Sequence, residues 1–334
     1  MKITVLIPSH GRPDKLRRCL DGLVQQTRSP SEIIVGLDGG SEREASALLT
    51  EYRTKLDGLR VLPLPKLGYI PTRATLLAKT QSDLFLSLND DVRPAESLVE
   101  AHIAAHQANT AAIVTGPAPW VTPINPNLFD RLVAESDLIF FDPIAELQQR
   151  GRLTFRHCVG LNFSCQTQAA RDCGGFHDLP HAYGYDDIEL AYRVGHSTGA
   201  SIDFALTAIV QHDHRYEPQE VMRREYKLGR AAWMYHQHNP AFTRELFQRD
   251  ISSPAELDFC RQTLTQTRTD AERIEMHFLE LSRHVHDAVS AELIPVLAQS
   301  WIPLKRFLWR WGLLDEANAT PERFTLVADA PELV

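Results

Sequence analysis

The chain has 334 residues, of which 43% are hydrophobic and 23% are charged, a composition typical of folded proteins and not of disordered ones. This length fits one large domain, or one domain with an appendage. The formal net charge of -8 argues against a general affinity for nucleic acid, because phosphate binding needs an excess of Lys and Arg.

The spacing of the cysteines and the length of the apolar stretches indicate in which compartment the protein is expected. The five cysteines form no C-x-x-C pair, which disfavours a disulfide framework and a structural zinc site. No stretch approaches the roughly 20 apolar residues that span a bilayer. The apolar run Ile3–Ile7 is also too short for a signal peptide. We therefore expect a cytoplasmic protein with reduced thiols.

The first half of the chain alternates strand-like and helix-like segments. Apolar runs predict buried strands, and the segments between them have helical periodicity; the strands are expected at 3–7, 33–35, 61–62 and 84–88, and the helices from Pro13 and at 41–56, 72–80 and 95–107. This alternation predicts right-handed βαβ crossovers and a mostly parallel sheet. Three strands end in Pro8-Ser9-His10, Asp38-Gly39-Gly40 and Asn89-Asp90-Asp91, and ligands bind at this edge of an open α/β sheet.

The rest of the chain has fewer strand signals. We expect a strand at 112–115, a helix at 128–140, an extended segment at 153–165, a turn at 172–175 and a helix from Asp186 to Gly195 that Asp186 caps. Long helical patterns follow residue 216, and helix starts are expected at Ser253-Pro254 and at the capping box Thr269–Glu272. These patterns predict a helical appendage.

Three motifs could carry chemistry, and each also has an ordinary structural explanation. Asn89-Asp90-Asp91 ends a buried strand, where the carboxylates either bind a divalent cation or form a solvated turn. Asp186 and Asp187 begin a helix, where acids either complement the helix dipole or provide a general base. His212 and His214 alternate along an extended segment, so both could face one metal ion or lie in solvent.

The order and spacing of the motifs resemble one known family. Residues 3–12 (ITVLIPSHGR) look like its opening strand and Pro-Ser-x-x-Arg turn, and residues 33–42 (IIVGLDGGSE) like its second strand and acidic Gly-Ser loop. Further matches, in the same order, are Gly68–Arg73, Asn89–Asp91, Asp172–Phe176, Asp186–Leu190 and the late metal-binding histidine, His212. Over roughly residues 1–215 the chain thus resembles the inverting glycosyltransferases of family 2.

This resemblance implies the fold and the domains. The family has the GT-A fold, a Rossmann-like α/β architecture with a mostly parallel central sheet, here followed by a C-terminal helical appendage. We expect a nucleotide-sugar-binding and catalytic domain at residues 1–215 and a helical region at residues 216–334. Four positions depart from the family pattern: Leu37 replaces the first of two acids, Asn89 begins the metal motif, Asp186 replaces the usual glutamate, and Tyr185 replaces the tryptophan that usually precedes it.

Carried over position by position, the resemblance also implies the site. The nucleotide would be bound by Pro8, Ser9, Arg12, Asp38, Arg73 and Asp90. Asp91 and His212 would hold a divalent cation, Mn²⁺ or Mg²⁺, and Asp187 would be the catalytic base. We expect Tyr185, Asp186 and Asn162 to lie at the acceptor or to support the residues that contact the substrates.

The expected activity is metal-assisted, inverting transfer of a sugar from a nucleotide-sugar to a hydroxyl of a glycan or lipid-linked acceptor, as in polysaccharide biosynthesis. UDP is the commonest nucleotide in the family, so a UDP-sugar is the expected donor. One alternative is a nucleotidyltransferase that makes sugar nucleotides, although Pro8–Gly11 lacks the Gly-rich loop with Arg and Lys that is typical of that class. Another is an inactive sugar-nucleotide or glycan-binding protein, which the presence of Asp91 and Asp187 disfavours.

One segment of the appendage allows two interpretations. Trp301–Trp311 combines tryptophan rings with Lys and Arg, a composition found at membrane interfaces. The same pattern also fits a helix packed inside the protein. The first interpretation predicts peripheral contact with the inner face of the membrane, and the second predicts that the rings are buried.

Overall fold

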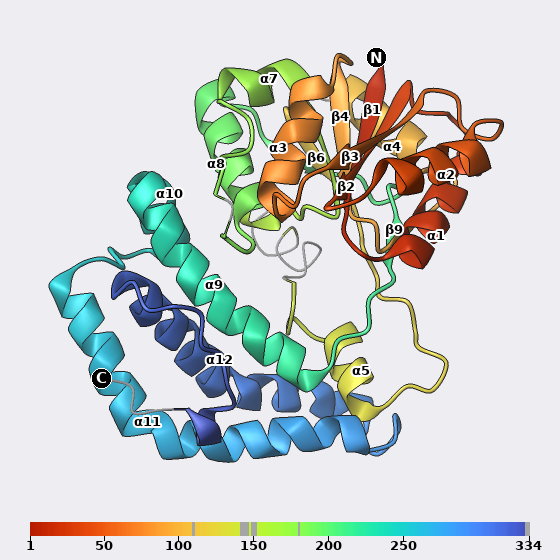
Figure 1. The fold of residues 1–334 in the computed structure, drawn as a ribbon. Helices are drawn as coiled ribbons and strands as arrows, with labels where there is room; N and C mark the ends of the chain where they lie inside the picture. Colours follow the sequence, from red (N-terminus) through yellow and green to blue (C-terminus); the bar gives the residue numbers. More distant parts are fainter. Residues whose placement is uncertain (109–110, 141–146, 148–151, 180, 331–334) are drawn as a thin grey trace. The chain divides into compact units, whose positions relative to one another are not determined.

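The computed structural model describes residues 1–108, 111–140, 147, 152–179 and 181–330, and its chain divides into two compact units (Figure 1). The first unit contains residues 1–121, 143–181 and 186–214, and the second contains residues 122–142, 182–185 and 215–334. The helical unit thus takes two short segments from the first two-thirds of the chain. The expected assignment of roles to residues 1–215 and 216–334 stays a prediction.

The first unit is an α/β domain. Its strands are β1 (Ile3–Ser9), β2 (Glu32–Asp38), β3 (Leu59–Leu64), β4 (Leu84–Leu88), β5 (Val92–Pro94), β6 (Ile113–Thr115), β7 (Asn162–Gln166), β8 (Ile202–Phe204) and β9 (Val210–His212). Its helices are α1 (Pro13–Val24), α2 (Glu42–Tyr52), α3 (Tyr69–Lys79), α4 (Leu98–Ala108), α7 (Thr167–Asp172) and α8 (Asp186–Thr198). The predicted α/β class is confirmed.

The main sheet has seven strands in the order β3-β2-β1-β4-β7-β6-β8. Strands β3, β2, β1 and β4 are parallel, whereas β7 runs antiparallel between β4 and β6. A separate two-stranded ladder pairs β5 with β9. The sheet is therefore mostly parallel, as predicted, and one strand of reversed direction lies in its middle.

Helices cover both faces of this sheet. On one face, a Cβ atom added to Gly36 of β2 would lie 3.0 Å from Thr72 and Leu76 of α3, so the glycine lets this helix approach closely. On the other face, His102 of α4 is hydrogen-bonded to Asn162 of β7. Every residue of β1 and β4 is buried between these layers, which explains why both strands read as continuous apolar runs.

The second unit is helical. Its helices are α5 (Leu128–Ala134), α9 (Pro218–His238), α10 (Pro240–Phe247), α11 (Pro254–Glu280) and α12 (Ile294–Ala317), and Figure 1 shows α9, α11 and α12 packed side by side. Helices α9 and α12 cross at two glycines. A Cβ atom on Gly229 would lie 1.9 Å from the carbonyl oxygen of Trp309, and one on Gly312 would lie 1.9 Å from that of Tyr226. Only residues without side chains permit this contact between backbones.

Several predicted boundaries differ from the structure. Ser253 caps α11 as predicted, but Thr269–Glu272 lies inside this 27-residue helix and does not begin a new one. A capping box acts only where backbone N–H groups lack helical partners, and the tertiary packing of α11 continues through this point. The segment 153–165 is strand only from Asn162, after a 3₁₀ turn at Phe155–His157.

Two further helix boundaries also need correction. The helix predicted at 128–140 ends at Ala134. Asp186, predicted to cap α8, is instead the first residue of that helix. The preceding Tyr185 has a φ of 65°, so the chain enters α8 from the left-handed region and not through an aspartate cap.

The tryptophans of residues 301–311 belong largely to the core of the helical unit. Trp301 and Trp311 are 2% and 0% exposed, and the Trp301 ring stacks on Phe278 with centroids 3.9 Å apart. Trp309 Nε1 donates a hydrogen bond of 3.2 Å to Tyr185 Oη. This burial favours the internal-packing interpretation over a membrane anchor.

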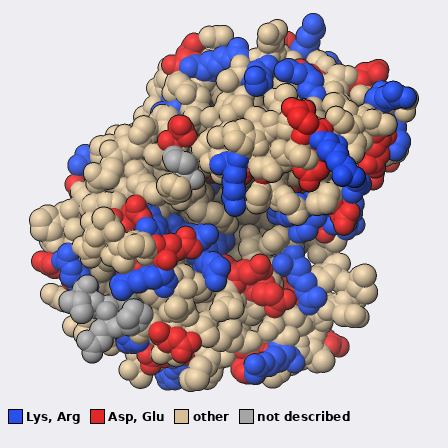
Figure 2. All heavy atoms as spheres, in the orientation of Figure 1, with Lys and Arg blue, Asp and Glu red and all other residues tan. Residues whose placement is uncertain are grey.

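Two further features concern possible membrane-spanning helices and the distribution of charge on the surface. Within the described part of the chain, no helix combines the length and the apolar character needed to cross a bilayer. On the face shown in Figure 2, basic and acidic side chains are interspersed, in keeping with 35 Lys and Arg against 43 Asp and Glu.

Candidate active site

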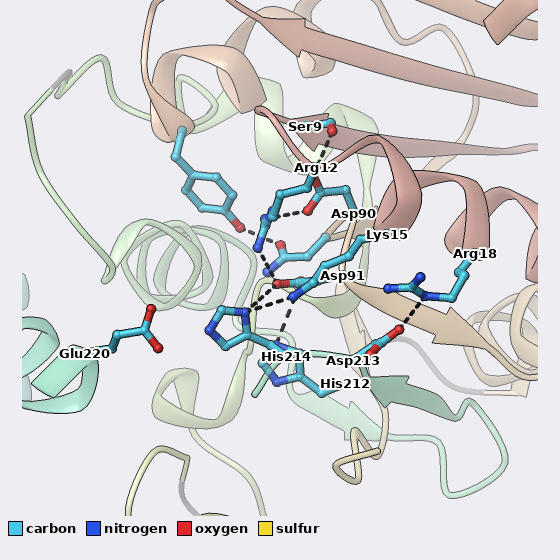
Figure 3. Close-up of polar contacts among 12 residues, drawn as sticks. Ser9, Arg12, Lys15, Arg18, Asp90, Asp91, His212, Asp213, His214 and Glu220 are labelled. Atoms are coloured by element: carbon cyan, nitrogen blue, oxygen red, sulfur yellow. Dashed lines mark hydrogen bonds and ion pairs between the residues drawn. The ribbon is translucent and has the colours of Figure 1, made fainter. Parts of the chain in front are cut away.

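The carboxyl ends of β1 and β4 are adjacent in the sheet, so the residues that follow them meet. Ser9 Oγ donates a hydrogen bond of 2.7 Å to Asp90 Oδ2. Arg12, immediately before α1, bridges the acidic motif: its guanidinium pairs with Asp90 Oδ1 and lies 2.6 Å from Asp91 Oδ2 (Figure 3). Burial raises the pKa of Asp90, and Arg12 and Ser9 oppose this shift. Arg12 compensates the charge that two adjacent acids bring to a buried strand end.

Asp38 ends β2 beside this cluster. Its Oδ1 accepts hydrogen bonds from the backbone N–H groups of Leu67 (2.6 Å) and Gly68 (3.2 Å), which precede α3. His10 Nδ1 lies 2.6 Å from the Asp38 carbonyl oxygen. Asp38 therefore fixes the entry to α3 and joins the ends of the first three parallel strands around one edge of the sheet.

A short ladder brings the two histidines to Asp91. Val92 of β5 pairs with His212 of β9, and the backbone N–H of Asp213 donates 2.7 Å to the carbonyl oxygen of Asp91. As a result, His212 Nε2 lies 3.8 Å from Asp91 Oδ1, and His214 Nδ1 lies 3.6 Å from Asp91 Oδ2 (Figure 3). Residues more than 100 positions apart in sequence thus converge on one carboxylate.

The chemistry of this cluster fits a divalent cation. Asp91 Oδ1 is buried and accepts no hydrogen bond from the described residues, which leaves a carboxylate oxygen with lone pairs for a ligand. Burial lowers the pKa of His212 to about 4, so its ring is neutral at physiological pH, the form that binds metals. Among the described residues, no group of three or more His, Cys, Asp or Glu forms a metal site, so Asp91 and His212 would need ligands from the substrate.

A second cluster lies at the start of α8. Arg73 of α3 donates a hydrogen bond of 2.7 Å to Asp186 Oδ2, and the two side chains are 1% and 2% exposed. Arg73 also donates to the carbonyl oxygen of Gly160 and lies 4.6 Å from the ring centroid of Tyr69. Arg73 and Asp186 therefore form a buried ion pair, and neither has much surface to offer a ligand.

Asp187 has a different environment from Asp186. Its Oδ2 accepts a hydrogen bond of 2.5 Å from the N–H of Gly160, its Oδ1 accepts one of 2.8 Å from the N–H of Ile188, and the residue is only partly buried. Burial and the adjacent charge of Asp186 raise the pKa of Asp187 to about 6. A carboxylate held in place by backbone donors, with a pKa near neutrality, is suited to accept a proton.

Tyr69 connects the two clusters. Its hydroxyl donates a hydrogen bond of 2.6 Å to Asn89 Oδ1, next to the acidic motif. Its ring lies 4.6 Å from the guanidinium carbon of Arg73, which pairs with Asp186. Tyr69 thus contacts Asn89 of one cluster through its hydroxyl and Arg73 of the other through its ring. That the two acidic motifs face one pocket stays a prediction.

Three further predicted residues have these contacts in the fold. Pro8 is a buried residue of β1. Asn162 is fully buried in β7, and its side chain bonds to His102 and to the carbonyl oxygens of Pro117 and Ala208. Tyr185 belongs to the helical unit, where its ring packs edge-on against Tyr235 and Phe247.

Three residues at the site were not predicted from the sequence. Tyr69 stands one helical turn before Arg73 on α3, a spacing at which side chains meet, so Arg73 could have drawn attention to it. Lys15 Nζ lies 3.2 Å from His214 Nδ1, and no sequence signal relates these positions. Gly160, whose N–H and carbonyl oxygen contact Asp187 and Arg73, lies in a loop without a recognisable motif.

Comparison with known proteins gives consistent matches. The family model described as glycosyl transferase family 2 matches residues 4–170. Among curated proteins, glycosyltransferase AglE of Haloferax volcanii is 20% identical over 70% of this chain and 74% of its own length. O-antigen chain rhamnosyltransferase RfbN of Salmonella typhimurium is 23% identical over 73% of the chain and 76% of its own length.

Two further matches extend the comparison. The pre-mycofactocin glycosyltransferase of Mycobacterium tuberculosis is 25% identical over 69% of the chain, which spans 46% of that longer protein. Among solved structures, S. aureus TarS 1-349 in complex with UDP has a TM-score of 0.50 and 15% identity, and the match covers 97% of this chain and 94% of that one. This likeness concerns the fold, which is GT-A. With a family model that matches half of its length, the chain belongs to glycosyl transferase family 2 and is a glycosyltransferase.

Proposed function

We propose that the protein transfers a sugar from a UDP-sugar to a hydroxyl of a glycan or lipid-linked acceptor, with inversion at the anomeric carbon. UDP is named as the ligand of TarS in the solved structure that shares this fold, which supports the choice of nucleotide. The observation that carries the proposal is the set of contacts by which Tyr69 links the two acidic clusters: its hydroxyl bonds to Asn89, and its ring lies against Arg73, the partner of Asp186. We assign the first cluster to binding the diphosphate and the second to removing the proton.

On the donor side, the proposal assigns the nucleotide to the edge formed by β1, β2 and β4. Asp38 would accept hydrogen bonds from the base or ribose, and Ser9 and Arg12 would line the nucleotide together with Asp90. Asp91 and His212 would hold Mn²⁺ or Mg²⁺, which when bound stabilises the negative charge on the leaving diphosphate. Arg12 already neutralises part of the acidic motif, so the cluster can accept a dianionic ligand at a modest electrostatic cost.

On the acceptor side, Asp187 would be the catalytic base. Its raised pKa makes it a stronger base than an exposed aspartate, and its two backbone hydrogen bonds fix the direction of the carboxylate. Removal of the hydroxyl proton by Asp187 prepares the acceptor oxygen for direct attack, and inversion follows because no covalent enzyme intermediate forms. Asp186 and Arg73 would support Asp187 from behind without contacting the acceptor.

Two measurements test this function. A thermal-shift panel of nucleoside diphosphates, each with and without Mn²⁺, should give the largest increase in melting temperature with UDP plus Mn²⁺, because a ligand that binds the native state stabilises it. NMR of the product from an α-linked donor should then show a β-linkage. Retention of configuration, or no stabilisation by any nucleoside diphosphate, would contradict the proposal.

A further inference from the structure

Lys15 is the residue of this site whose role neither the family motifs nor the proposed mechanism explains. It lies in the first turn of α1, one residue on from the Arg12–Pro13–Asp14 entry, and its side chain is half-buried. Figure 3 shows it extending towards Asp91 and His214. Its ammonium lies 3.2 Å from His214 Nδ1, and the same ring nitrogen lies 3.6 Å from Asp91 Oδ2.

The direction of this hydrogen bond is fixed by chemistry. An ammonium has three donors and no lone pair, so Lys15 must donate to the ring nitrogen, which therefore carries no hydrogen. Lys15 thus places its positive charge on an imidazole nitrogen that itself lies 3.6 Å from the carboxylate that the cation would need.

The neighbouring cations are engaged differently. Arg12 is shared between Asp90 and Asp91. Arg18 lies 2.7 Å from Asp213, and Arg93 reaches the same carboxylate at 2.9 Å. These arginines form ion pairs, whereas Lys15 contributes its ammonium to an imidazole. Moving Lys15 onto a ligand would break its hydrogen bond to an imidazole, whereas moving Arg18 or Arg93 would take a charged partner from Asp213.

We propose that Lys15 binds the diphosphate of the donor, with His214 orienting its ammonium before the nucleotide arrives. This inference rests on the proposed function and adds a binding residue to it. A lysine acts on phosphate as a compact point charge, so it tolerates the change in geometry as the diphosphate leaves. In this arrangement Asp91 and His212 bind the cation, and Lys15 binds the diphosphate anion.

The test compares nucleoside diphosphates with their nucleosides, which lack the phosphates. Isothermal titration calorimetry would measure the Kd of UDP, GDP and dTDP, and of uridine, guanosine and thymidine, with and without Mn²⁺. For the diphosphate that the wild type binds most tightly, Lys15→Gln should raise the Kd by about tenfold to a hundredfold, the range of one charge-assisted hydrogen bond. The Kd of the matching nucleoside should stay within about twofold, and Lys15→Arg should recover most of the loss.

Arg17→Gln is the matched control. Arg17 lies on the same helix and pairs with Glu51 and Asp14 at the surface, so its loss should leave every Kd within about twofold. If Lys15→Gln binds the diphosphate as the wild type does, or weakens the nucleoside equally, the inference is wrong while the proposed function stands. If the wild type binds none of the three diphosphates, the proposed function fails, and the inference fails with it.

Discussion

Asp187→Asn removes the proposed base and hardly changes the size of the side chain. The asparagine has one oxygen, so it can accept from only one of the two N–H donors, Gly160 or Ile188, that now bind the carboxylate at 2.5 and 2.8 Å. The other donor would face an amide NH₂. Such an unmatched donor costs roughly 1–3 kcal/mol of the free energy of unfolding, which leaves the variant folded.

The kinetic effect should be much larger than this structural one. Loss of a positioned base reduces the rate by about 10²–10⁴-fold, so kcat should fall by that factor while the Kd for UDP stays within about twofold. Asp187 lies on the acceptor side in the proposal and has no assigned contact with the nucleotide. A loss in kcat without a loss in donor affinity would therefore distinguish a base from a donor-binding residue.

The raised pKa of Asp187 also predicts a pH dependence. The carboxylate accepts a proton only when ionised, so activity should rise with pH through about 6 and then reach a plateau. Because the pKa is raised, Asp187 becomes protonated at a higher pH than an exposed aspartate does, so the rate at pH 5 should already be well below the plateau.

The assay is the transfer rate measured from pH 4.5 to 8.5 with saturating donor, for the wild type and Asp187→Asn. Circular dichroism at each pH provides the control for unfolding. The wild type should show one acidic limb of slope one, and the residual activity of the variant should not show it. A variant with the wild-type rate, or with the same acidic limb, would refute the assignment of Asp187 as the base.

Three further predictions concern other parts of the molecule. Arg73→Met should destabilise the protein by about 3–5 kcal/mol in urea unfolding, because it leaves the buried Asp186 without its partner; an unchanged midpoint would contradict the burial of this pair. Gly312→Ala should lower the melting temperature by several degrees, since its Cβ would lie 1.9 Å from the carbonyl oxygen of Tyr226, and a neutral effect would argue against the helix crossing. His212→Ala should weaken Mn²⁺ binding in the presence of UDP by about tenfold or more, as followed by electron paramagnetic resonance, and equal affinity would exclude this ring as a ligand.

Local patterns in the sequence were sufficient for the parallel half of the sheet. The continuous apolar runs of β1, β2 and β4 are the signature of strands buried on both faces, and polar residues at their carboxyl ends mark the ligand edge. Because adjacent parallel strands present these ends together, the meeting of Ser9 and Asp90 followed from the order of elements alone.

Other features depended on contacts between distant segments. The antiparallel insertion of β7 between β4 and β6 has no local signal, since strand direction is set by its neighbours and not by its own residues. The helix α11 continues through Thr269–Glu272 because packing outweighs a local capping signal. The burial of Trp311 decides between the two interpretations that the sequence left open, since an amphipathic pattern does not specify which apolar partner covers it.

For the candidate site, the sequence alone determined which residue types end the strands and begin α8, because these are properties of short segments. Only the tertiary structure decided how each one is used: Asp186 is neutralised by Arg73, whereas its neighbour Asp187 is left with backbone donors and a raised pKa. The same holds for Lys15 and His214, which are 199 positions apart and meet only because the β5–β9 ladder folds back beside α1. Ionisation and charge pairing depend on distances through space, and a one-dimensional pattern does not contain these distances.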